Sequence, residues 1–240
     1  MNKKIRLYFS DKIKSDLVAH LKNEQSHYLK DVMRLKAGDK FSVFNNQGEW
    51  NASIESYEKK AAKIKILEKT RDRKNEHNIW LAFTPIKQNP LNFIIQKGTE
   101  LGIQKFIPIL SERTVVKDVN VKRIKKIIVE SSEQSNRISI PEITKLETLK
   151  FFLANFPKKG CLVFCDINCN KSDLKNILSK KELSPVCILV GPEGDFSENE
   201  RKLIINLEQH QPISLAKNIL RSETAALAAI TLVNYHLNLS

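Results

Sequence analysis

Hydrophobic and polar residues alternate along the chain in two different ways, and the change falls near residue 70. Residues 40–68 contain three runs in which apolar and polar positions alternate, KFSVF, EWNASIESYE and AAKIKILE, and this pattern predicts strands. Asn45-Asn46-Gln47-Gly48 between the first two runs predicts a hairpin turn. Upstream, KIRLYF has strand character and SDLVAHLKNEQSHYLKDVMRL has helix-like spacing. Short, closely spaced strands of this kind indicate a small β-barrel or sandwich.

From residue 79 on, strand-like apolar runs alternate with helix-like segments. The expected strands are IWLAFTP, KFIPILS, CLVFCD, VCILVG and PISLA, and the expected helices are NFIIQKGTELG, VKRIKKIIVESSEQSN, KSDLKNILSKKEL, SENERKLIINLEQH and SETAALAAITLVNYHLNL. This alternation predicts an α/β domain with a mostly parallel sheet and helices on both faces. The polar stretch TRDRKNEHN separates the two patterns, so we expect a domain at 1–70, a linker at 71–78 and a second domain at 79–240.

The composition points to a basic protein that works on a polyanion. The chain of 240 residues carries 40 Lys and Arg against 27 Asp and Glu, a net charge of +13. Nucleic acid is the simplest partner for such a charge, and a lysine-rich solubilising surface is the alternative. Residues 1–70 hold 15 basic and 9 acidic residues, so positive charge is denser in the N-terminal part.

Several classes of protein are disfavoured by the same sequence. No apolar run reaches the roughly 18 residues that span a bilayer, and charges interrupt the N-terminus where a signal peptide would be apolar. We therefore expect a soluble, cytoplasmic protein. Cys161, Cys165 and Cys169 are spaced like an iron–sulfur ligand run, but the first two alternate within one apolar strand and lack a glycine-rich loop. Buried free thiols fit better, and we expect no metal.

The stretch LVGPEGDFSENE at 189–200 is unusually rich in glycine for this chain, so its backbone is more flexible than elsewhere. It holds two of the seven glycines, Gly191 and Gly194, directly after the apolar run VCILV. Glycine permits positive φ and leaves no β-carbon in the way of a ligand. Ser197 and Glu200 then form the S-x-x-E pattern of a helix capping box. The loop therefore joins a strand to a helix, and it is either a plain tight turn or a ligand loop, because ligands bind at such ends in open α/β sheets.

A second stretch, ISLAKNILRSETAALAAITL at 213–232, has the same strand–loop–helix order. Arg221 precedes the expected helix, and Glu223 falls in its first turn, where a carboxylate suits the positive end of the helix dipole. The alanines that follow allow close packing. Neither stretch is a phosphate loop or a Rossmann fingerprint, since the G-x-x-x-x-G-K-[ST] and G-x-G-x-x-G patterns are absent from the whole chain.

Together, the two stretches resemble the RsmE family, the uridine N3-methyltransferases of small-subunit ribosomal RNA in the SPOUT superfamily. Three further stretches match in order, HYLKDVMRLKAGD at 27–39, QKGTELGIQKFIPILSERTVV at 96–116 and ESSEQSNRISIPEI at 130–143. The resemblance thus covers nearly the whole chain. It implies a small N-terminal PUA-like RNA-binding β-barrel and a C-terminal SPOUT domain with a deep trefoil knot. It also implies S-adenosylmethionine (SAM) as cofactor and a homodimer with the active site near the subunit interface.

The resemblance implies a set of cofactor-binding residues in the two loops. A third loop is expected either near Thr84, after the strand IWLAFTP, or at the end of CLVFCD. The expected cofactor-binding residues are Thr84, Leu189, Val190, Gly191, Pro192, Glu193, Gly194, Leu215, Ala216, Ile219, Leu220, Arg221, Glu223, Thr224 and Ala225. Two departures from the family pattern stand in these loops: Asp195 replaces a usual glycine, and Ala216-Lys217-Asn218 replaces G-x-R.

The implied activity is methyl transfer from SAM to N3 of a single uridine in the decoding region of 16S rRNA, on the assembled 30S subunit. Transfer needs an unpaired base, loss of the N3 proton and in-line positioning. Arg221 is the candidate for binding the uracil oxygens or a phosphate, and Glu193 and Glu223 are the candidate bases, although both carboxylates also suit a helix N-terminus.

The family resemblance also suggests RNA-facing positions, which are Arg6, His27, Arg34, Lys36, Gln134 and Arg137. Lys97, Glu100 and Arg113 match the family pattern without an assigned role. Two alternatives stay open at this point. One is a SPOUT enzyme with a different target, such as a ribose 2′-hydroxyl or guanine N1. The other is a non-catalytic ribosome-assembly factor of the same fold.

Overall fold

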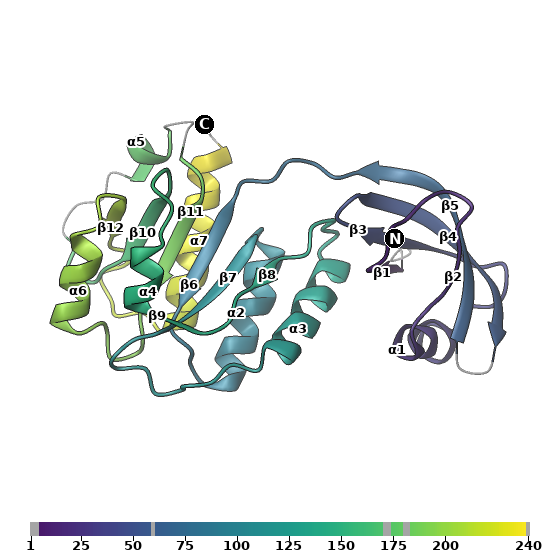
Figure 1. The fold of residues 1–240 in the computed structure, drawn as a ribbon, viewed down its shortest axis with the longest axis horizontal. Coiled ribbons are helices and arrows are strands. Elements are labelled where there is room, and N and C mark those ends of the chain that lie inside the picture. The colour runs from purple at the N-terminus through teal and green to yellow at the C-terminus, as the bar shows by residue number, and fades with distance from the viewer. Residues whose placement is uncertain (1–4, 59–60, 170–173, 180–182, 239–240) are drawn as a thin grey trace. The chain divides into compact units, whose positions relative to one another are not determined.

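The computed structural model describes residues 5–58, 61–169, 174–179 and 183–238. They form two compact units (Figure 1). The first unit comprises Met1–Asn75 and Ser132–Ile140, and the second comprises Glu76–Ser131 and Pro141–Ser240. The segment Ser132–Ile140 therefore belongs to the first unit, although in sequence it lies between the two parts of the second.

The first unit is built on a five-stranded sheet in the order β1-β3-β4-β5-β2. β1 pairs in parallel with β3, and the other pairs are antiparallel, so the sheet is mixed. Its elements are β1 (Arg6–Tyr8), β2 (Val18–His20), α1 (Asn23–His27), a π-helix η1 (Tyr28–Val32), β3 (Lys40–Asn45), β4 (Gly48–Glu58) and β5 (Ala61–Asp72).

The alternating runs of the N-terminal part form the strands that they predict. KFSVF, EWNASIESYE and AAKIKILE fall in β3, β4 and β5, and Asn45 pairs with Gly48 across the expected hairpin. Ile54, Ile64 and Ile66 are fully buried on the inward face of this sheet. The helix-like spacing upstream is only partly confirmed, because Val18–His20 pairs with β5 as an edge strand and the helical part is limited to α1 and η1.

The second unit contains a seven-stranded sheet in which every pairing is parallel. The order along the sheet is β12-β10-β11-β6-β7-β8, and β9 pairs with the far end of β7. The strands are β6 (Ile79–Phe83), β7 (Lys105–Leu110), β8 (Glu142–Ile143), β9 (Glu147–Thr148), β10 (Cys161–Cys165), β11 (Val186–Val190) and β12 (His210–Ile213). All of these strands therefore run in the same direction, and β6, β7, β10, β11 and β12 end at the same edge of the sheet.

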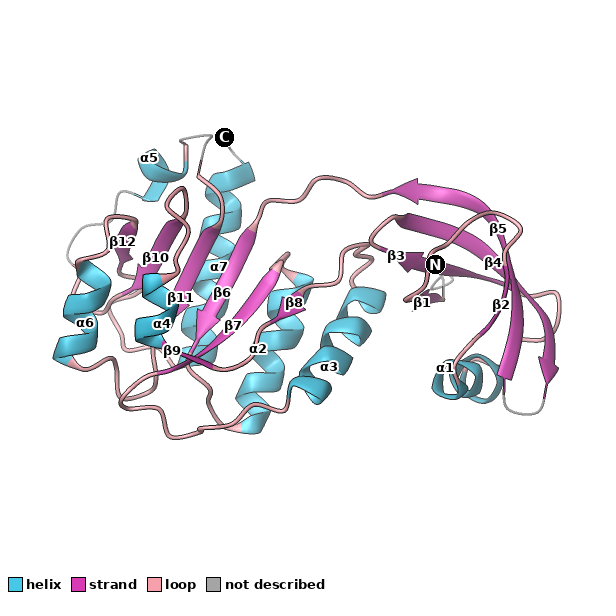
Figure 2. Cartoon of the chain, in the orientation of Figure 1, coloured by secondary structure: helices cyan, strands magenta, loops and turns pink. Residues whose placement is uncertain are grey.

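Helices cover both faces of this sheet (Figure 2). α4 and α6 pack together on one face, and α7 packs on α2, α5 and β11 on the other. The helices are α2 (Gln88–Glu100), α3 (Val121–Gln134), α4 (Leu149–Ala154), α5 (Leu174–Leu178), α6 (Glu198–Ile205) and α7 (Ser222–Asn238). The α/β prediction is thus confirmed as a parallel sheet with helices on both sides.

The element order agrees with the sequence pattern, with a few differences. Of the helix expected from KSDLKNILSKKEL, only α5 is described, and residues 170–173 and 180–182 lie outside the described part. β8, β9 and α4 have no counterpart among the expected elements, and the two-residue strands β8 and β9 leave no periodic signal. No helix in the described ranges is long and apolar enough to cross a membrane.

Candidate active site

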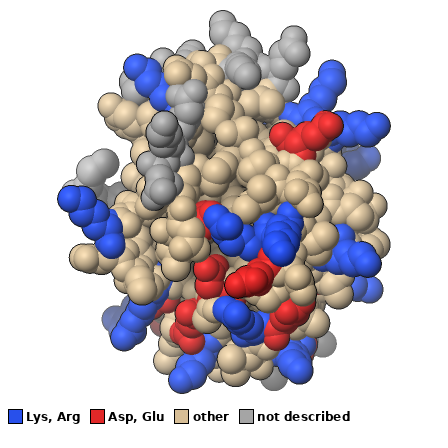
Figure 3. All heavy atoms as spheres, turned by 90° about the vertical axis from the view of Figure 1, so that its left-hand side faces the viewer, with Lys and Arg blue, Asp and Glu red and all other residues tan. Residues whose placement is uncertain are grey.

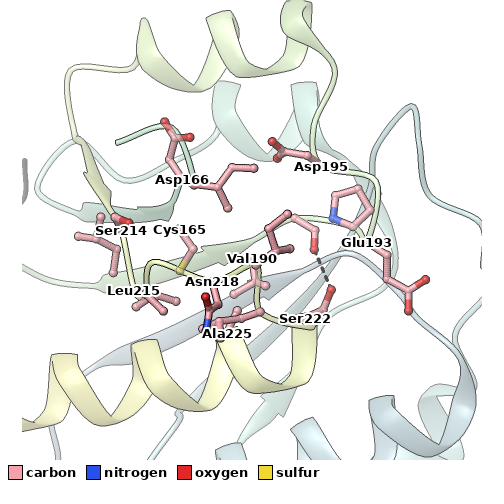
Figure 4. Close-up of a pocket in the computed structure, with 17 residues that line it drawn as sticks. Cys165, Asp166, Val190, Glu193, Asp195, Ser214, Leu215, Asn218, Ser222 and Ala225 are labelled. Atoms are coloured by element: carbon pink, nitrogen blue, oxygen red, sulfur yellow. Dashed lines mark hydrogen bonds between the residues drawn. The ribbon is translucent and has the colours of Figure 1, made fainter. Parts of the chain in front are cut away.

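A pocket opens at the carboxyl edge of the parallel sheet, among the loops that follow β10, β11 and β12 (Figure 4). It holds about 670 Å³ of space free of protein atoms, open solvent included. Its lining residues are Cys165, Asp166, Ile167, Val190, Gly191, Pro192, Glu193, Asp195, Ile213, Ser214, Leu215, Ala216, Asn218, Ile219, Leu220, Ser222 and Ala225.

The pocket brings together most of the residues that the sequence singled out in the two loops. Those that line it are Val190, Gly191, Pro192, Glu193, Leu215, Ala216, Ile219, Leu220 and Ala225. Those that lie outside its lining are Thr84, Leu189, Gly194, Arg221, Glu223 and Thr224. Of the two places considered for a third loop, the end of CLVFCD contributes Cys165 and Asp166 to the wall.

The close approach of Phe196 explains one glycine of the loop after β11. A β-carbon on Gly191 would lie 2.9 Å from a carbon of the buried Phe196 ring, so a larger residue would displace the ring. Gly194 differs, because its nearest neighbours would be 3.8 Å or more from a β-carbon. No contact with the residues that the structure describes thus demands glycine at 194.

The left-handed position of this loop is occupied by Asp195 and not by a glycine. Its φ is 59°, whereas neither Gly191 nor Gly194 has a positive φ. The freedom of these two glycines to adopt positive φ is therefore not used in this structure. Aspartate tolerates this region better than most residues, and its Oδ1 accepts a 2.7 Å hydrogen bond from the Phe196 N–H. The substitution for the family's glycine is thus compatible with the loop.

The turn after β7 supports the loop from outside. Arg113 donates a 2.7 Å hydrogen bond to the carbonyl of Gly194, which gives this arginine a structural role. Ser197 and Glu200 form the predicted capping box of α6. The Glu200 carboxylate also accepts a 2.8 Å hydrogen bond from the Glu112 N–H. The loop after β11 is therefore held at Gly194 and at the start of α6.

An ion pair between a buried aspartate and a half-buried arginine fixes the loop after β10. Asp166 is 4% exposed and accepts a 2.7 Å hydrogen bond from Arg201 in α6 and a 2.9 Å one from the Asn168 N–H. The hydrogen bond to Asp166, and then the charges of Asp166 and Asp195, raise the pKa of Arg201. No simple motif in the sequence marks this pair, since Asp166 and Arg201 are 35 residues apart.

The start of α7 completes the pocket. Ser222 Oγ donates a 3.3 Å hydrogen bond to the carbonyl of Gly191, which ties the two loops together. Ala225 faces the pocket from the first turn of this helix. Arg221 is exposed just before the helix, and Glu223 is half-buried in its first turn. Among the three candidate catalytic residues, only Glu193 lines the pocket, with its side chain pointing away from it in Figure 4.

The electrostatic character of the wall is opposite to that of the whole chain. Among the described residues that line the pocket, none is Lys, Arg or His, whereas Asp166, Glu193 and Asp195 are carboxylates. Such a wall suits a cationic ligand with an apolar part, because Val190, Leu215 and Ile219 supply apolar surface.

The thiol in the wall is not a ready nucleophile. Burial raises the pKa of Cys165 to about 12 and that of Cys161 to about 11, so both remain protonated near neutral pH. All four cysteines are free. Within the described ranges, no three His, Cys, Asp or Glu side chains are grouped to hold a metal ion.

Two of the six suggested RNA-facing residues are buried in the first unit. Arg6 is 7% exposed and hydrogen-bonds Glu49 as well as the carbonyls of Ser132, Glu133 and Arg137. Arg137 is 8% exposed and donates to Ser139. These contacts give both arginines a structural role.

The other four suggested residues, His27, Arg34, Lys36 and Gln134, are exposed. His27 Nδ1 lies 2.6 Å from the Asp31 carboxylate. Arg34 has a left-handed backbone with φ of 57°, which turns the chain at the end of the helical segment.

Comparison with known proteins agrees with the division into two parts. Residues 73–234 match the RNA methyltransferase domain family, and residues 21–67 match the RNA methyltransferase PUA domain family. Ribosomal RNA small subunit methyltransferase E of Rickettsia conorii is 33% identical over 233 residues, which cover 95% of this chain and 94% of that protein. The enzyme of the same name from Bacillus subtilis is 29% identical over 231 residues, covering 90% and 89%.

Solved structures of related proteins have a similar fold. A ribosomal RNA small subunit methyltransferase E from Neisseria gonorrhoeae, bound to SAM, aligns with a TM-score of 0.86 at 26% identity over 97% of this chain and 98% of that one. A Legionella pneumophila protein in complex with the cofactor SAM aligns with a TM-score of 0.88 at 26% identity over the same shares. The chain therefore belongs to the ribosomal RNA small subunit methyltransferase E family, with an RNA methyltransferase domain and a PUA domain.

Proposed function

We propose that this protein transfers a methyl group from SAM to N3 of a single uridine in the decoding region of 16S rRNA, on the assembled 30S subunit. The observation that carries the proposal is the pocket at the carboxyl edge of the sheet, within the part that matches the RNA methyltransferase domain. Two relatives of the same fold have been solved with SAM bound. Both the enzyme class and the cofactor follow from this combination.

The residues of the pocket fit SAM. This cofactor is a cation with a purine and a sulfonium, and it supplies an activated methyl group. Val190, Leu215 and Ile219 offer apolar surface for a purine, and the Asp195 carboxylate offers a counter-charge. Gly191 lines the pocket without a side chain, so a ligand can approach its backbone closely.

The protein's own contribution to the chemistry is to orient the base and to remove a proton. Uracil N3 carries a weakly acidic proton that must leave before or during methyl transfer. Glu193 and Glu223 are the proposed bases, and Arg221 is the proposed contact to the uracil oxygens, where its positive charge would stabilise the anion. Arg221 and Glu223 flank Ser222, which the hydrogen bond to Gly191 holds beside the cofactor loop.

For the whole chain, we propose a PUA-like β-barrel at 1–70, a linker at 71–78 and a SPOUT domain with a trefoil knot at 79–240. His27, Arg34, Lys36 and Gln134 remain the proposed RNA contacts, because they are exposed. Their role would be to hold phosphates, which fixes position without reading sequence.

A homodimer is part of the proposal. α2 and α7 share an apolar hollow lined by Phe93, Thr224, Leu227, Ala228, Thr231, Leu232 and Tyr235. Phe93 is 44% exposed and Tyr235 is 61% exposed, which is unusual for aromatic side chains of this size. A second copy of this face would bury them, and sedimentation analysis would show the dimer.

The function is tested by incubating the protein with methyl-labelled SAM and 30S subunits that lack the modification, followed by mass analysis of the digested RNA. We expect one 3-methyluridine per subunit. A methyl group on a ribose oxygen or a guanine would contradict the proposed target and favour another SPOUT activity. Binding of 30S subunits without SAM binding or methyl transfer would favour a non-catalytic assembly factor.

A further inference from the structure

A basic segment lies beside the pocket and has no role in the function described so far. Residues 113–126, RTVVKDVNVKRIKK, contain six basic side chains and one acidic one, a net charge of +5 in a chain whose total is +13. All six basic side chains are exposed, and they are Arg113, Lys117, Lys122, Arg123, Lys125 and Lys126.

The charges of this segment are not balanced within the chain. Among the described residues, no carboxylate forms an ion pair with Lys117, Lys122, Lys125 or Lys126. Asp118, the one acidic residue of the segment, accepts a hydrogen bond from the Val119 N–H. The positive charges therefore face solvent and repel each other.

The placement of these charges on α3 also opposes the helix dipole. Lys122 and Arg123 lie in the first turn of the helix, which has no acidic residue, and Glu133 lies in the last turn, which has no basic one. Cations are destabilising near a helix N-terminus and anions near its C-terminus. The stability of the helix therefore does not explain why basic residues come first and acidic residues last. Binding of an external anion near the start of the helix would explain it.

The segment begins at the pocket's own loop. Arg113 hydrogen-bonds the carbonyl of Gly194, and the chain then runs from the carboxyl end of β7 to the start of α3 (Figure 1). β7 and β11 belong to one parallel sheet, so both end at the edge where the pocket opens. By contrast, acidic and basic side chains are interspersed on the face of α6 and β12 (Figure 3).

We propose that residues 113–126 bind the phosphate backbone of the RNA substrate next to the pocket. This inference rests on the proposed function, and it adds a surface of the methyltransferase part to the contacts expected in the N-terminal part. Lysines on an exposed helix contact phosphates without reading bases, so the segment would fix the position of the strand that carries the target base.

The test compares two pairs of lysines in the second unit, and the two lysines of each pair are neighbours in sequence. Lys125→Gln with Lys126→Gln removes two charges from the segment. Lys158→Gln with Lys159→Gln removes two from exposed positions before β10, at the opposite edge of the sheet. Affinity for 30S subunits is measured as a function of salt. Each lost phosphate contact lowers the slope of log K against log salt by roughly 0.7–0.9.

We expect the first double variant to lower the slope by about 1.5 and to weaken binding, on the order of tenfold near physiological salt. The Lys158 and Lys159 variant and a Lys125→Arg, Lys126→Arg variant should keep the wild-type slope. SAM affinity by calorimetry should be equal in all four proteins. An unchanged slope in the Lys125→Gln, Lys126→Gln variant, or an equal loss in the Lys158→Gln, Lys159→Gln variant, would overturn the inference. If the wild-type protein binds neither 30S subunits nor SAM, the proposed function itself fails.

Discussion

The ring of Phe196 lies so close to Gly191 that a β-carbon on this glycine would come within 2.9 Å of a ring carbon. Phe196 is 4% exposed and packs in the core under α4 and α6, at a tilted angle to Phe164. Packing of Phe196 in the core thus determines the path of the loop after β11. The contact between Phe196 and Gly191 therefore also determines the shape of the pocket wall.

Gly191→Ala should therefore be destabilising, whereas Gly194→Ala should not. The first variant overpacks the Phe196 ring and should cost about 1–3 kcal/mol of unfolding free energy. The second meets only ordinary contacts and should stay within about 0.5 kcal/mol of wild type. Urea denaturation measures both. If Gly194→Ala keeps its stability but loses SAM affinity, the ligand is what requires glycine there. Equal stabilities of the two variants would contradict the assignment.

Asp195 should be replaceable by glycine but not by alanine. Its left-handed φ of 59° costs an ordinary L-residue about 1–2 kcal/mol, and the hydrogen bond from its carboxylate to the Phe196 N–H offsets part of this. Asp195→Gly should match or exceed the wild-type stability, and Asp195→Ala should lose about 1 kcal/mol. An alanine variant as stable as the glycine variant would show that the loop is not held in this conformation.

The carboxylates of the pocket should make it prefer SAM to the demethylated product, S-adenosylhomocysteine, which lacks the sulfonium charge. Asp166 is paired with Arg201, so Asp195 is the wall carboxylate to test. One charge–charge interaction of about 1 kcal/mol corresponds to about fivefold in affinity. Asp195→Asn should reduce the SAM preference by about this factor in calorimetry, and an unchanged ratio would remove Asp195 from the charge recognition.

The stability of the first unit should fall in acid because of Glu49. Burial alone would raise the pKa of this carboxyl, but the charges and hydrogen bonds of Arg6 and Arg71 hold it below its ordinary value. Its stabilising effect is therefore complete above the unfolded pKa of 4.5 and is lost as the pH falls through the lower folded value.

Glu49→Gln supplies the control for this effect. It should cost about 3–5 kcal/mol near neutral pH, because it leaves Arg6 buried without its charge partner. It should also remove the contribution of the Glu49 carboxyl to the loss of stability as the pH falls. Denaturation curves of both proteins across the acid range measure the difference, and parallel curves would contradict the role of Glu49.

Much of the fold could be predicted because the buried face of each strand leaves a periodic signal. The alternation in AAKIKILE and the apolar run VCILV identify β5 and β11 directly, and Ser197 with Glu200 marks the start of α6. The two-residue strands β8 and β9 have no such signal. The pairing of Val18–His20 with β5 also depends on a partner more than 40 residues away, so local spacing favoured a helix.

The candidate site was predictable where motifs are local, and less so where partners are distant. The two loops at 189–194 and 215–225 supply over half of the pocket wall. The Asp166–Arg201 pair and the support of Gly194 by Arg113 join segments 35 and 81 residues apart, which no local pattern reveals. The sequence alone suggests that Arg6 and Arg137 are exposed, because arginine side chains usually are. In the structure, carboxylate and carbonyl groups hydrogen-bond the buried Arg6 and offset the cost of removing its charge from water.

The claim at the centre of this account is that the methyl donor binds among the loops after β10, β11 and β12. A crystal structure of the protein grown with SAM tests it most directly. We expect SAM in contact with the Val190–Asp195 and Ser214–Leu220 segments, with its closest backbone approach at Gly191. SAM bound at another place in the fold, or crystals without SAM together with no binding in calorimetry, would contradict the account.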